Sequence, residues 1–160
     1  MSEAQEMEWM RAALAVCRRG IAVGESPFGA VIASQAGAVV CATHNTVRST
    51  GDPTAHAEIN AIRAACRLLG TIDLSGHVIV STCEPCPMCA AAIHWANLDA
   101  VCFGAGIDDA GKAGFRELAL PVRTLYAQGG SSVMVHPAVM RAECQELFAE
   151  WRRGPHPDPY

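Results

Sequence analysis

Residues 77–105 read HVIVSTCEPCPMCAAAIHWANLDAVCFGA, and they contain the pattern from which the fold class can be predicted. Residues 77–82 and 100–105 are short apolar runs typical of buried strands, and residues 87–97 between them are typical of a helix. A strand, a helix and a second strand in this order predict a parallel pair joined by a crossover. The segment CEPCPMC at 83–89 follows the carboxyl end of the first strand, where α/β sheets bind their ligands.

The flanking sequence extends this unit on both sides. Apolar periodicity and turn residues predict three further helices and three further strands. Two of the helices are expected over 4–22 and 138–153, the third opens within DPTAHAE at 52–58, and the strands are expected over 26–34, 38–43 and 131–136. The expected architecture is a three-layer α/β/α sandwich with a mixed five-stranded sheet, because helices would cover both faces. We expect a single domain over residues 1–160 with an extended, proline-rich tail at 154–160.

Two segments carry no periodic pattern. Residues 44–52 are polar and residues 106–131 are glycine-rich, so both are predicted to be irregular. A helix is expected to open directly after the first of them, within DPTAHAE. Asp52 or Thr54 would cap this helix, and Pro53 would lie in its first turn.

The composition indicates a globular protein without a membrane-spanning segment. Of the 160 residues, 51% are hydrophobic and 18% are charged. No apolar run approaches the roughly 20 residues that span a bilayer. The N-terminal stretch MSEAQEMEW is acidic and lacks the apolar core of a secretory signal. We therefore expect a cytoplasmic protein.

The net charge and the distribution of basic residues indicate whether the protein binds nucleic acid. The formal net charge is −4, and the twelve basic residues occur in small groups. Binding of a polyanion requires a concentrated basic surface. This argues against nucleic acid as the main partner without excluding it.

Eight cysteines in a reducing compartment predict free thiols, not disulfides. Cys83, at the end of a strand, is interpreted as a packed thiol, with a role as a metal ligand or beside a metal site left open. Five others lie in apolar patterns and are interpreted as buried thiols: Cys17, Cys41, Cys66, Cys102 and Cys144. His136 carries no partner motif and is interpreted as structural or solvated.

The cysteines of CEPCPMC fit a metal site. An iron–sulfur run of the ferredoxin type needs a fourth cysteine where this chain has Ile93, which argues against a cluster. Zinc needs three or four Cys or His ligands. Cys86 and Cys89 lie at a helix start, where the helix dipole favours thiolates. His56 at the start of another helix is a natural third ligand, and three protein ligands leave the fourth position for water, as in catalytic zinc sites.

Glu58 follows His56 by two residues and completes a recognisable pattern. His-x-Glu followed by Pro-Cys-x-x-Cys is the signature of zinc nucleobase deaminases, and here it comprises residues 56–58 and 85–89. On these motifs the chain resembles the cytidine deaminase-like superfamily. The resemblance implies one zinc per chain and a hydrolytic deamination in which Glu58, not itself a ligand, carries the proton.

The wider sequence is similar to small bacterial guanine deaminases. The similarity rests on GDPTAHAEINAIR, STCEPCPMCAAAIHWA, SPFGAVI and DDAGKAGF, and it covers roughly residues 8–117. DPTAHAE also occurs in tRNA adenosine deaminases, which both ends of the chain resemble as well. The first hypothesis is therefore conversion of guanine to xanthine and ammonia, and the alternative is adenosine-to-inosine editing in tRNA.

The guanine deaminase resemblance also implies further site residues. Asn45, eleven residues before His56, would contact the base, with a turn asparagine as the alternative. Phe28 would stack on the base or pack in the core. Glu117 stands where that family usually has an aspartate that acts as a second proton carrier; a solvated Arg–Glu pair is the alternative. The tail would cross to the partner subunit of a homodimer, with Tyr160 closing the partner's site.

Two other possibilities remain. Cytosine, guanosine and aminated triazines are alternative substrates. The sequence does not rank them, because the shape of the pocket decides which of them binds. A structural zinc in a non-catalytic binding module is a different class of function. Glu58 and the three-ligand set argue against it.

Overall fold

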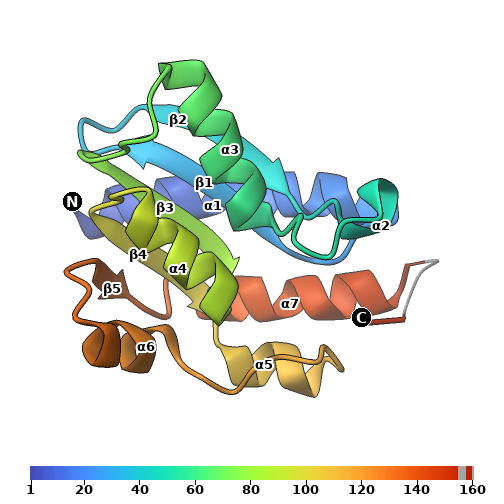
Figure 1. The fold of residues 1–160 in the computed structure, drawn as a ribbon. Helices are drawn as coiled ribbons and strands as arrows, with labels where there is room; N and C mark the ends of the chain where they lie inside the picture. Colours follow the sequence, from blue (N-terminus) through green and yellow to red (C-terminus); the bar gives the residue numbers. More distant parts are fainter. Residues whose placement is uncertain (155–157, 160) are drawn as a thin grey trace.

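The computed structural model describes residues 1–154, 158 and 159, and its centre is a five-stranded mixed sheet (Figure 1). The strand order is β2-β1-β3-β4-β5. β1 pairs antiparallel with both β2 and β3, whereas β3, β4 and β5 run parallel. The strands are β1 Gly29–Ser34, β2 Val39–His44, β3 His77–Cys83, β4 Ala100–Ala105 and β5 Met134–His136.

Helices cover both faces of this sheet, which confirms the predicted α/β sandwich. Figure 1 shows α3 and α4 in front of the strands and α1 behind them. None of the helices in the described part of the chain is long and apolar enough to cross a membrane. The helices are α1 Glu3–Ala22, α2 Val47–Thr50, α3 Ala57–Leu69, α4 Pro87–Trp95, α5 Ile107–Lys112, α6 Val122–Gly129 and α7 Arg141–Arg152.

Two apolar layers separate the helices from the sheet. On one face, α1 and α7 bury large side chains such as Trp9 and Leu147 against β3 and β4. On the other face, α3 contributes mainly alanines, and α4 and α6 contribute Ile93 and Tyr126. Because alanine side chains are small, α3 can lie close to the sheet. Its first turn reaches the carboxyl-terminal part of β3, where Ser81 bonds to Glu58.

The start of α3 differs from the prediction. The helix begins at Ala57 with His56 as its N-cap, not at Asp52 or Thr54. The Asp52 carboxylate accepts hydrogen bonds from the backbone N–H and the hydroxyl of Thr54, at 2.8 and 2.6 Å. This local turn competes with helix formation, because aspartate and threonine bond readily to nearby backbone groups. The helix therefore begins only after this turn, with His56 at its N-terminal end.

The two segments predicted to be irregular contain short helices. Residues 44–52 include α2, and residues 106–131 include α5 and α6. The prediction was wrong at both places because each of these helices is stabilised by a carboxylate from a distant part of the chain. Glu25 accepts from the backbone N–H groups of Arg48 and Ser49 at the start of α2, at 3.2 and 2.9 Å.

Candidate active site

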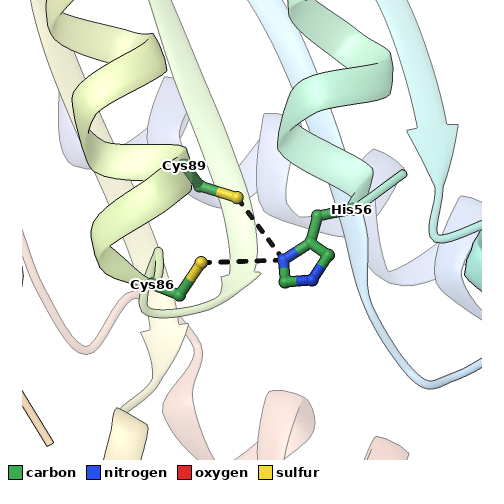
Figure 2. Close-up of side chains that lie close together, drawn as sticks. All are labelled: His56, Cys86 and Cys89. Carbon is green, nitrogen blue, oxygen red and sulfur yellow. Dashed lines mark hydrogen bonds between the residues drawn. The ribbon is translucent and has the colours of Figure 1, made fainter. Parts of the chain in front are cut away.

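Three potential metal ligands meet where the N-termini of α3 and α4 converge (Figure 2). His56 is the N-cap of α3 and Cys86 is the N-cap of α4, both in extended backbone conformation. Neither side chain caps its own helix, and the two point toward each other. Nδ1 of His56 lies 3.7 Å from Sγ of Cys86 and 3.5 Å from Sγ of Cys89.

The geometry of this cluster fits zinc. Bond lengths of about 2.0–2.1 Å to nitrogen and 2.3 Å to sulfur place the donor atoms of a tetrahedral site roughly 3.3–3.8 Å apart. The two nitrogen–sulfur distances fall in this range without rearrangement. Two thiolates and one imidazole are a zinc donor set that leaves one position open.

The electrostatics of the cluster favour a thiolate. Hydrogen bonding from the Cys89 thiol, and then from His56, lowers the pKa of Cys86 to about 4 despite its burial. Burial disfavours the imidazolium of His56, but its hydrogen bond to Cys86 and the nearby Glu58 outweigh this and raise its pKa. Binding of a metal cation would therefore displace protons from the thiols and the imidazole of this cluster.

Glu58 lies beside the cluster in the first turn of α3. Its side chain is buried, and its Oε1 accepts a hydrogen bond of 3.2 Å from the hydroxyl of Ser81 in β3. Burial raises the pKa of the Glu58 carboxyl, and the charge of His56 opposes this only in part. A carboxyl with a raised pKa next to a metal site is suited to carrying protons at neutral pH.

A cavity of about 210 Å³ opens in front of the cluster. Its walls combine the catalytic candidates with aromatic and charged side chains from four separate parts of the chain. The lining residues are Phe28, Pro53, His56, Glu58, Cys83, Glu84, Cys86, Phe115, Arg116 and Glu117. Pockets for drug-sized ligands measure roughly 300–1,000 Å³, so this cavity is the size of a smaller ligand.

Glu117 is half-buried and lines this cavity, as a second proton carrier would. Burial and the neighbouring Cys86 raise the pKa of its carboxyl, while His56 lowers it. The alternative prediction was a solvated ion pair between Arg116 and Glu117. The ion pairs of the described residues do not include one between these two side chains. The role of Glu117 in proton transfer stays a prediction.

Phe28 packs against the aromatic core, as one of its two predicted roles requires, and its stacking on a base stays a prediction. Its ring lines the cavity and also packs edge-to-face on Phe115, with centroids 4.9 Å apart. Asn45 is fully buried and does not line the cavity; its Oδ1 accepts the N–H of Val47 at 3.0 Å, as in a turn. Its contact with a base stays a prediction. Tyr160 lies outside the described residues.

The sequence did not single out Glu84, although it stands between two cysteines of the motif. Glu84 lines the cavity, and its carboxylate accepts hydrogen bonds from the N–H groups of Ile107 and Val122, at 3.2 and 2.9 Å. It therefore connects the metal-binding loop to the segment that carries Glu117. Cys83 is buried, as predicted, and its thiol points to the Gly106 carbonyl at 3.7 Å.

Residues 3–105 match the family described as the cytidine and deoxycytidylate deaminase zinc-binding region, and the chain belongs to this family. It is thus a zinc-binding deaminase domain. The chain is 44% identical over 108 residues to a guanine deaminase of Bacillus subtilis, covering 67% of this chain and 69% of that protein. It is 40% identical over 97 residues to a tRNA-specific adenosine deaminase of Aquifex aeolicus, covering 61% of this chain and 64% of that protein.

A solved structure gives a longer match. A guanine deaminase from Nitrosomonas europaea superposes with a TM-score of 0.84 at 28% identity, over 91% of this chain and 83% of that one. The likeness therefore includes most of α5–α7, beyond the part that matches the family.

Proposed function

We propose that the protein is a zinc-dependent hydrolase that deaminates a free nucleobase, converting guanine and water to xanthine and ammonia. One observation carries the proposal. Two carboxyl groups with raised pKa, Glu58 and Glu117, face one small cavity beside a His/Cys/Cys cluster. The similarity to two guanine deaminases supports guanine as the base.

In this proposal His56, Cys86 and Cys89 hold one zinc ion. Bound zinc supplies the Lewis-acid chemistry that activates water near neutral pH. Glu58 takes a proton from the attacking water and delivers it to the ring nitrogen next to the carbon that carries the amine. The same carboxyl then supports protonation of the departing amine, so one residue moves protons in both directions.

Glu117 provides the second carboxyl. It reaches the cavity from the loop after α5, on a wall that Glu58 does not occupy. We assign it the last proton relay, from Glu58 to the departing amine, which then leaves as ammonia, while Phe28 and Phe115 form the apolar wall for the flat ring. Asn45 would bind the edge of the base after a change in its present hydrogen bond to Val47.

The charge of the cavity favours a neutral base over a nucleic acid. Three glutamate residues, Glu58, Glu84 and Glu117, line it, against one arginine, Arg116. A phosphate backbone would be repelled at such a surface, since nucleic-acid binding depends on cationic contacts. Adenosine deamination in tRNA stays the second candidate because of the 40% identity to such an enzyme.

We further propose a homodimer whose tails close the sites. Arg48 donates a hydrogen bond to the carbonyl of Asp158, and Pro159 packs at Gly114, so the described end of the tail lies beside the cavity wall. These contacts lie within one chain. The same contacts made between two chains would exchange the tails at little cost, as in domain swapping.

The test is to incubate the pure zinc-loaded protein with a panel and to measure ammonia. The panel contains guanine, guanosine, cytosine, an aminated triazine and a tRNA, with inosine formation measured for the last. We expect release from guanine that varies weakly with salt. Editing of tRNA with steep salt dependence and no guanine turnover would contradict the proposal.

A further inference from the structure

A second group of metal-ligating side chains lies away from the candidate active site, between α1 and the parallel strands β4 and β5. It consists of Glu6, Cys102 and His136, whose ligand atoms all lie within 4.8 Å of one another. Sequence motifs do not reveal it, because the three residues come from three distant segments.

The sheet register explains why two of these residues meet. Cys102 in β4 is the direct partner of His136 in β5. Side chains at paired positions of neighbouring strands stand on the same face of the sheet. Cys102 belongs to the apolar layer beneath α1, so His136 points to α1 as well.

Helix α1 supplies the third residue. Oε1 of Glu6 lies 2.9 Å from Nδ1 of His136, and their side chains are 13% and 35% exposed. The thiol of Cys102 is fully buried and is covered by Met1, whose sulfur lies 4.0 Å away. The group is therefore closed on the side of the sheet and reachable from solvent past the imidazole.

We propose that Glu6, Cys102 and His136 form a second zinc-binding site, which links the N-terminal helix to the edge strand β5. One thiolate, one imidazole and one carboxylate are all ordinary zinc ligands. Donor atoms of a tetrahedral zinc lie roughly 3.3–3.8 Å apart, so small side-chain rotations suffice from the present spacing. Hard cations such as Mg²⁺ are excluded because they do not take thiolate ligands.

A simple ion pair between Glu6 and His136 explains the arrangement of the three side chains less completely than a metal site does. Such a pair at a partly exposed position contributes little stability and gives no reason for a thiol facing it. A zinc ion would fix β5, which has three residues and forms the edge of the sheet. Zinc bound to the folded chain but not to the unfolded one raises the melting temperature.

The test uses the protein with its catalytic zinc in place. Dialysis against a zinc buffer, followed by metal analysis, should give a second equivalent of zinc per chain and a higher melting temperature. His136→Gln should lose the second equivalent and the thermal shift, while a glutamine can still hydrogen-bond to Glu6. Cys102→Ala should do the same.

Matched controls separate this site from other histidines and thiols. His94→Gln changes a histidine that bonds to Ser131, and Cys144→Ala removes another buried thiol of the same layer; both should keep the second equivalent. A wild-type protein that binds a single equivalent would overturn the proposal. So would a second equivalent that persists in both His136→Gln and Cys102→Ala. If Cys102→Ala does not fold, His136→Gln decides alone.

Discussion

Replacement of Glu58 by glutamine tests the proposed proton carrier most directly. The change removes the one carboxyl in the first turn of α3 that lies beside the His/Cys/Cys cluster, and keeps its size. General acid–base catalysis by one residue contributes about 10²–10⁴ in rate. We therefore expect turnover to fall by that factor, equivalent to about 2.7–5.4 kcal/mol of transition-state stabilisation.

The structure also predicts that Glu58→Gln does not weaken folding. The Ser81 hydroxyl can donate to an amide oxygen as it does to the carboxylate. Burial raises the pKa of Glu58, so the fold disfavours the ionised carboxylate above the pKa of the unfolded chain, and this penalty disappears with a neutral side chain. In zinc-free protein at neutral pH, the free energy of unfolding should stay equal or rise.

The assay combines ammonia release from the best substrate of the panel, zinc content and urea unfolding. Ser81→Ala is the matched control: it removes the hydrogen bond to Glu58 but leaves the carboxyl, and should cost far less turnover. A Glu58→Gln protein that retains more than about a tenth of wild-type turnover would refute the reasoning, since that loss lies below the range for a proton carrier. A variant that loses its zinc would show instead that Glu58 is a ligand.

Three further outcomes are expected. Cys86→Ala should lose the active-site zinc and lower the melting temperature, whereas Cys66→Ala, a half-buried thiol elsewhere, should keep both; metal analysis checks this. Asp109→Asn should cost about 1–3 kcal/mol in urea unfolding at neutral pH. Hydrogen bonds from Gly106, Gln145 and Arg141 overcome burial and lower the pKa of Asp109, so this stability is lost as pH falls through that lowered value. Deleting residues 155–160 should leave zinc content unchanged and cut turnover at least about tenfold by admitting water; full activity would refute the tail's role.

The elements that the sequence predicted correctly are those whose signal is local. The strands at 77–82 and 100–105 appear as β3 and β4, since continuous apolar runs of this length suit a sheet covered on both faces. The two motifs also predicted that three side chains would cluster: His56, Cys86 and Cys89. This prediction needed no register information, because each residue stands at a helix start next to the sheet. The second group, Cys102 with His136, depends on strand register, and no spacing along the chain encodes that pairing.

The sequence did not predict the helices that flank the cavity, and the reason is again a long-range contact. Segments predicted to be loops fold into α2, α5 and α6 because two distant carboxylates satisfy the N–H groups that a helix start leaves unpaired. Glu25 does so for α2, and Glu84 does so for the first residues of both α5 and α6. Since Glu117 lies between α5 and α6, Glu84 holds the cavity-lining segment that carries Glu117 from within the cysteine motif itself. The motif thus supplies the ligands and also anchors the residue proposed as the second proton carrier, so substitutions at Glu84 are expected to alter substrate binding without removing a single zinc ligand.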